Sequence, residues 1–183
     1  MFSSKVKAKY CIAYLDKDQL EELVKIVKSW ADGSYDPDDI EKIKKFKIPD
    51  KYRTPPEILY RGEYVVKEEL YLLANGKKVE THGISWTTDK KTARHFAQDH
   101  GGLYGVVWKY KPQKEDIILD VDLFASDHTI ELPYKESEVL LKERLEVSKN
   151  DLVAIYDGKD PEGEKYRLPS LFMNLVKEPT ALF

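Results

Sequence analysis

The spacing of hydrophobic residues predicts two helices near the start of the chain. In Asp18–Ala31 apolar side chains recur at every third or fourth position, which is the period of one buried helix face. Asp18 and Glu21 are spaced as in a capping box at the start of this helix. A second, more highly charged helix is expected over Asp38–Phe46, and it ends before Pro49 because proline cannot continue a helix.

The next segments alternate between strand and helix. Ile58–Arg61 indicates a short strand that ends at Gly62, and the sequence VKEELYLLANG indicates a helix that ends at Asn75 and Gly76. Later in the chain LYGVVWKYK, DIILDVD, EVLLK and DLVAIYD all predict strands. Helices first and strands later are typical of an α+β fold on an antiparallel or mixed sheet. We expect one domain over residues 1–183, mainly helical in 1–55 and with a β core in 56–183.

The sequence GISWTT predicts a strand with two different faces. Ile84 and Trp86 alternate with Ser85 and Thr87, so the apolar pair is expected in the core and the hydroxyl pair on the opposite face. Thr88 followed by Asp89 is typical of a helix start. The expected buried face of that helix consists of Ala93, Phe96 and Ala97.

Composition excludes several broad classes of function. Thirty basic and thirty-three acidic residues give a net charge of −3, which does not favour a general nucleic-acid or membrane binder. The basic run KIKKFK is interpreted as the solvated face of a short helix. Cys11 is the only cysteine and the four histidines have no recognised ligand spacing, so neither an internal disulfide nor a metal site is expected. The charged N-terminus predicts a cytoplasmic protein with no membrane segment.

Two acids stand at the start of one predicted strand, in KESEVLL. Side chains alternate along a strand, so Glu136 and Glu138 are expected on one face with their carboxylates about 6 to 7 Å apart. Arg61 at the end of ILYRG and the hydroxyls of Ser85 and Thr87 are further polar residues on predicted strands. Each of these features, taken alone, also fits a solvated strand end.

In chain order the three motifs resemble those of the Arg–Ser–Glu branch of the mono-ADP-ribosyltransferases. That family has an aromatic–Arg strand, a Ser-X-Ser strand followed by a helix with a Phe-Ala pair, and a Glu-X-Glu strand. The resemblance covers Leu59–Val147, about half of the chain, and is closest in character to small phage enzymes and bacterial arginine-modifying toxins. It implies an ADP-ribosyltransferase-like fold, with N-terminal helices packed on a two-sheet β core and NAD as co-substrate without a metal.

The resemblance implies a role in NAD binding for several residues. Arg61 would hold the NAD phosphates, and the backbone of Gly62 would approach the nicotinamide amide. Ser85 would position the catalytic glutamate, and Thr87 stands where the family more often has a second serine. Phe96 could reach the nicotinamide, although its helical spacing with Ala93 also fits core packing.

The resemblance also implies how ADP-ribose would reach an arginine of a target protein. Glu138 matches the catalytic glutamate, which stabilises the charge that develops when the nicotinamide–ribose bond breaks. Glu136 matches the acid that orients the acceptor guanidinium and takes its proton. Tyr134, in the loop before the strand, would lie against that guanidinium, or would pack on its own turn.

Other functions use the same residues. An NAD glycohydrolase would need Arg61, Ser85 and Glu138 but not Glu136, because water replaces the arginine acceptor. A binding module of the same fold would not consume NAD. Transfer to RNA is supported in the sequence only by the basic run KIKKFK. A glycosidase could also use two acids, but the sequence shows no recognisable sugar-stacking groove. The sequence does not identify the target protein.

Overall fold

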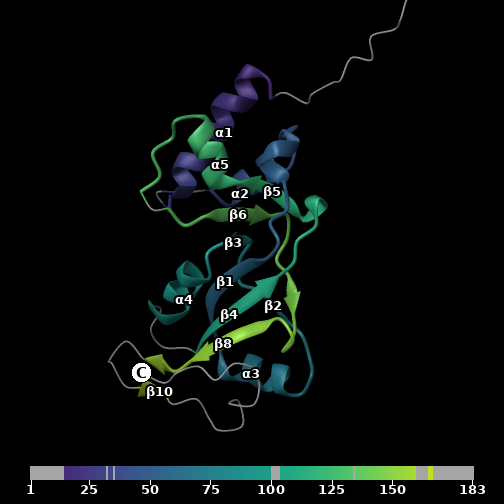
Figure 1. Cartoon of the computed structure of the whole chain (residues 1–183), viewed down its shortest axis with the longest axis vertical. Coiled ribbons are helices and arrows are strands. Elements are labelled where there is room, and N and C mark those ends of the chain that lie inside the picture. Colours follow the sequence, from purple (N-terminus) through teal and green to yellow (C-terminus); the bar gives the residue numbers. More distant parts are fainter. Residues whose placement is uncertain are drawn as a thin grey trace, which may run out of the picture.

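The computed structural model describes residues 15–31, 33–34, 36–99, 104–133, 135–159 and 165–166. Among the described residues the helical elements up to residue 53 come first, and the strands follow them (Figure 1). The helical elements are α1 (Lys17–Ala31), α2 (Pro37–Ile43), the 3₁₀ turn η1 (Asp50–Arg53), α3 (Lys67–Ala74), α4 (Lys90–Asp99), the 3₁₀ turn η2 (Lys114–Asp116) and α5 (Val121–Asp127). The strands are β1 (Leu59–Val65), β2 (Val79–Glu80), β3 (Ser85–Thr87), β4 (Tyr104–Tyr110), β5 (Ile117–Asp120), β6 (Glu138–Leu141), β7 (Glu146–Val147), β8 (Leu152–Tyr156), β9 (Gly158–Lys159) and β10 (Lys165–Tyr166).

A six-stranded sheet in the order β5-β6-β3-β1-β4-β8 forms the centre of the structure. Its neighbouring strands are all antiparallel, and β2 with β7 and β9 with β10 form two small antiparallel sheets beside it. The expected α+β class is confirmed. The strand order is what matters for the site, because it puts β6, β3 and β1 side by side although they are far apart in the sequence.

Helices cover different parts of this sheet. Figure 1 shows α1, α2 and α5 together at the end of the molecule where β5 and β6 lie, and α4 beside the middle of the sheet. The helix α1 buries its apolar face, with Leu23, Ile26 and Val27 almost fully enclosed, in a cluster that includes Phe124 of α5 and Leu140 of β6. This packing fixes the last turn of α1 close to the start of β6.

The helix α4 lies unusually close to β1 and β4. A side chain on Gly62 would bring its Cβ within 1.7 Å of the backbone oxygen of Ala93, and one on Gly105 within 1.8 Å of that of Ala97. Ala93 and Ala97 are themselves buried, so small residues on both sides allow this contact. As predicted from the sequence, Asp89 starts the helix, since its Oδ1 accepts a hydrogen bond of 2.9 Å from the backbone of Lys91.

Several predicted boundaries were wrong. The helix α1 begins at Lys17 and is capped by Asp16, which accepts a bond of 2.8 Å from the Gln19 backbone, rather than by Asp18. The helix α2 ends at Ile43 rather than Phe46. The strand β1 does not end at Gly62 but continues to Val65, because the missing side chain admits α4 without interrupting the pairing with β4.

Two further differences concern the polar end of the sheet. The segment DIILDVD was expected to be a strand throughout, but the chain turns into α5 at Val121 because Asp120 accepts a bond of 2.9 Å from the Leu123 backbone. The expectation that Glu136 and Glu138 share one strand face was wrong as well. The strand β6 starts at Glu138, and Ser137 before it has a φ of 51°, outside the extended region.

The apolar pair Ile84 and Trp86 was expected to enter one core. Trp86 is 1% exposed and belongs to the cluster between the sheet and β2 and β7, whereas Ile84 precedes β3 and packs against the cluster under α1. Within the described part of the chain, no helix is both long and apolar enough to cross a membrane.

Candidate functional site

A cavity of about 420 Å³ collects the polar residues of three neighbouring strands. Arg61 on β1, Ser85 on β3 and Glu138 on β6 all line it. The strand order brings them together, since Tyr60 pairs with Thr87, which in turn pairs with Glu138. The three motifs, spread over almost eighty residues of sequence, therefore meet in one cavity.

Glu138 is one of two buried acids that line this cavity, with 9% of the residue exposed. Its Oε1 accepts two hydrogen bonds, one from the hydroxyl of Ser85 and one of 2.7 Å from the indole Nε1 of Trp30. Its backbone N–H donates to Oδ1 of Asp122 at 3.3 Å. The carboxylate is thus held by residues from β3 and α1, and the backbone of Glu138 is held by α5.

Burial is the main influence on the pKa of the Glu138 carboxyl, and it raises that pKa above its ordinary value. The hydrogen bonds from Ser85 and Trp30 favour the ionised form and lower the pKa, while the negative charges of Glu136 and Asp122 raise it. The net effect is a raised pKa, so ionisation of Glu138 lowers the stability of the folded protein.

Glu136 reaches the same cavity from outside β6. Its backbone oxygen accepts a bond of 2.5 Å from Thr87 Oγ1, and the following N–H of Ser137 donates to Asp122 at 3.2 Å. Burial first and the Asp122 charge second raise the pKa of Glu136, whereas the charge of His95 on α4 lowers it. Both acids therefore line one cavity, as the sequence predicted. The backbone turn at Ser137 brings them there, however, and not the alternation of side chains along a strand.

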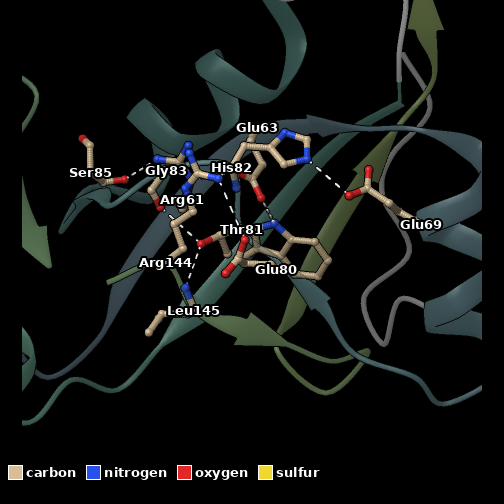
Figure 2. A network of polar contacts seen from close by, with 11 residues as sticks. Arg61, Glu63, Glu69, Glu80, Thr81, His82, Gly83, Ser85, Arg144 and Leu145 are labelled. Atoms are coloured by element: carbon tan, nitrogen blue, oxygen red, sulfur yellow. Dashed lines mark hydrogen bonds and ion pairs between the residues drawn. The ribbon is translucent and has the colours of Figure 1, made fainter. Parts of the chain in front are cut away.

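Arg61 is held in a defined orientation by protein acceptors (Figure 2). Its Nε donates to Glu63 at 2.6 Å and its Nη1 donates to the backbone oxygen of Ser85 at 2.5 Å. Nη2 passes over Gly83, where an added Cβ would lie 2.8 Å from it. The guanidinium is thus fixed as a planar fork at the cavity wall, which suits recognition of a phosphate or carboxylate.

Glu63 is a buried acid that organises this region. It is 4% exposed and accepts bonds from Arg61, from the backbone of His82 at 2.9 Å and from the indole of Trp108 at 2.7 Å. Three donors satisfy one buried carboxylate, so its charge is compensated within the protein. In Figure 2 the ring of His82 points away from this centre toward Glu69.

The remaining predicted site residues have mixed placements. The backbone of Gly62 lines the cavity, but its lack of a side chain is required by α4 on the other side. Phe96 is partly exposed on the cavity wall, whereas Ala93 and Ala97 of the same helix are buried. Thr87 is buried and also accepts a bond of 2.9 Å from the Asp89 backbone, so its hydroxyl connects β3, α4 and the Glu136 turn. Tyr134 lies outside the described residues.

Sequence reasoning missed three residues that contact the site. Trp30 was assigned only to the apolar face of its helix. Asp122 belongs to DIILDVD, which was predicted to be a strand, so no contact with the site was expected. Glu63 could have been found, since it stands two residues after Arg61 and therefore on the same face of β1. The described residues contain no group of three or more potential metal ligands.

Comparison of the chain with protein-family models, with curated proteins and with solved structures finds no match in any of the three. Function must therefore follow from the chemistry of the cavity.

Proposed function

We propose that this protein is an ADP-ribosyltransferase in fold and activity, which transfers ADP-ribose from NAD to arginine side chains of a target protein. The observation that supports this most is the meeting of Arg61, Ser85 and Glu138 in one cavity, with Glu136 at its edge. The cavity volume of about 420 Å³ is in the range of small-molecule sites. The fixed fork of Arg61 fits the diphosphate of NAD, and Phe96 and Tyr60 offer aromatic surface to its rings.

In the first step the bond between nicotinamide and ribose C1′ breaks, and nicotinamide leaves with the bonding electron pair. Positive charge develops on the ribose, as in glycoside cleavage. Glu138 is the group that would stabilise it, through a hydrogen bond to the ribose 2′-hydroxyl and through its own negative charge. Ser85 keeps the carboxylate in place and favours its ionised form.

In the second step a guanidinium nitrogen of the acceptor forms the new bond to C1′ and loses a proton. Arginine is a weak nucleophile while protonated, because its pKa is about 12 or higher. Glu136 would orient the guanidinium and accept the proton, and its raised pKa suits a base that must hold a proton briefly.

The test is to incubate the purified protein with NAD labelled in the adenylate part and a cell lysate, beside Glu138→Gln and Glu136→Gln. We expect labelled protein bands with the wild type and their loss in both variants. Nicotinamide release should fall by about 100-fold or more in Glu138→Gln, because a charge-stabilising group is removed from the reacting centre. It should persist in Glu136→Gln, since water can replace the acceptor.

The alternatives give different patterns. Nicotinamide release without labelled protein, abolished only by Glu138→Gln, would indicate an NAD glycohydrolase. No nicotinamide release from folded wild-type protein would contradict the proposed enzyme and leave a binding module. Label in nuclease-sensitive material would indicate an RNA acceptor.

A further inference from the structure

The hydrogen bonds of Glu138 are unevenly divided between its two oxygens. Ser85 and Trp30 both donate to Oε1, from β3 and from the last turn of α1. Among the described residues no hydrogen bond to Oε2 is found. Two donors on one oxygen fix the carboxylate plane and leave the other oxygen as the acceptor that is available to a ligand.

Trp30 has a second connection to the site, since its side chain lines the same cavity as Arg61 and Glu138. Its position depends on the packing of α1, in which Leu23, Ile26 and Val27 are at most 2% exposed. The bond from Trp30 spans 108 residues of sequence, so it ties the N-terminal helix directly to the first residue of β6. A tryptophan needed only for packing would not have to direct its N–H at a buried carboxylate.

We propose that Trp30 is a positioning residue for the reaction: its indole N–H, together with the Ser85 hydroxyl, holds Oε1 of Glu138 so that Oε2 is the oxygen that meets the ribose. This inference rests on the proposed function. It assigns to α1 a task at the reacting centre that the three sequence motifs do not include.

The charges around Glu138 determine the expected pH dependence. Glu136 and Asp122 raise the pKa of the Glu138 carboxyl, and Ser85 and Trp30 lower it. The cationic Arg61 on β1 lines the cavity as well, and His95 on α4 acts on Glu136. Activity needs ionised Glu138 and is lost as the pH falls through its pKa. Removal of the Trp30 N–H takes away a bond that favours the carboxylate, so the acid limb of the pH profile should move to higher pH.

The experiment compares Trp30→Phe with wild type, because phenylalanine keeps an aromatic ring and removes only the N–H and part of the volume. We expect kcat for nicotinamide release at pH 7 to fall about tenfold, because the variant loses one hydrogen bond to a charged group. KM for NAD should stay within about twofold, since the lost contact acts on the transition state. The acid limb should shift to higher pH.

Ile26→Val on the same helix is the matched control. Ile26 is 2% exposed and faces the core, so its truncation should weaken the packing of α1 without touching Glu138. It should lower Tm and leave the acid limb in its wild-type position. Equal acid limbs in wild type and Trp30→Phe, or equal shifts in both variants, would overturn the positioning role.

A second readout separates this inference from the proposed function. A ¹³C NMR titration of the Glu138 carboxyl measures its pKa without any turnover. A higher pKa in Trp30→Phe supports the bond from Trp30, and an unchanged pKa overturns it. A wild type that releases no nicotinamide would defeat the proposed activity, while the titration would still decide whether Trp30 holds Glu138.

Discussion

At the scale of single residues, the site contains a carboxylate that the fold would hold more easily if it were neutral. Burial raises the pKa of Glu138 above its value in an unfolded chain, in spite of the bonds from Ser85 and Trp30. A raised pKa means that the acid favours the folded state below its unfolded-state pKa, and that this contribution is lost as the pH rises through the folded-state pKa. At neutral pH the ionised group therefore costs stability.

Glu138→Gln should for this reason stabilise the protein at pH 7 while it removes the proposed activity. The amide keeps an acceptor oxygen for Ser85 and Trp30, and we expect Tm to rise by about 2–4 °C, as 1 kcal/mol does in a chain of this size. The gain should shrink as the pH falls through the raised pKa of folded Glu138, and it should vanish below about pH 4, where the carboxyl holds a proton in both the folded and the unfolded state. Calorimetry at several pH values measures this.

Glu146→Gln serves as a control, because Glu146 is exposed and forms a surface ion pair with Lys78. Surface pairs contribute little, so its Tm should not change measurably. A Tm of Glu138→Gln at or below that of wild type at pH 7 would contradict the assignment of a destabilising charge.

At the scale of elements, β1 carries three consecutive residues with different tasks. Arg61 faces the cavity, Gly62 admits α4, and Glu63 is buried and holds the Arg61 guanidinium. Close contact between β1 and α4 fixes the helix that carries Phe96 on the cavity wall. The site therefore depends on a packing contact in which a single methyl group cannot be accommodated.

Gly62→Ala should destabilise the protein by about 3 kcal/mol or more, because its Cβ would lie 1.7 Å from a backbone oxygen that can move only with the whole of α4. Gly76→Ala is the matched control. Gly76 has a φ of 72° and open space around it, so only conformational strain of about 1 kcal/mol is expected. Urea unfolding of both variants measures the difference, and equal losses of stability would contradict the close contact.

At the scale of the whole molecule, the cavity joins parts of the chain that pack in different clusters. Trp30 comes from the helical end around α1 and α5, whereas Arg61 and Phe96 come from the middle of the sheet and α4. A ligand that contacts both parts binds the folded state alone, since unfolding separates them. Bound ligand should therefore stabilise the entire fold.

NAD should raise the Tm of Glu138→Gln, in which the proposed turnover of NAD is at least about 100-fold slower, by about 5–10 °C at 100 times its Kd. Arg61→Lys in the same background keeps the positive charge but loses the planar fork, so most of this shift should disappear. Differential scanning fluorimetry with NAD and with free adenosine measures both effects. An equal shift with Arg61→Lys would argue against phosphate binding by Arg61.

Local patterns in the sequence were enough to predict most elements and several of the residues that line the cavity. The apolar period of α1, the alternation of β3 and the start of α4 at Asp89 depend on neighbouring residues, and these were predicted close to their observed positions. The resemblance added the roles proposed for Arg61 and Glu138, and the strand order brought these residues together.

Contacts between distant segments were decided only by the tertiary structure. The bond from Trp30 to Glu138 links residues 108 apart, and no local period records such a partner. The turn at Ser137 depends on Asp122 of α5, a helix that the apolar pattern did not reveal. Hydrophobic spacing indicates which face of a helix or strand is buried. Which other element packs against that face depends on how the strands and helices are ordered in space. The sequence alone therefore determined which polar residues could act together, and the packing of α1 and α5 around β6 decided how Glu138 is held.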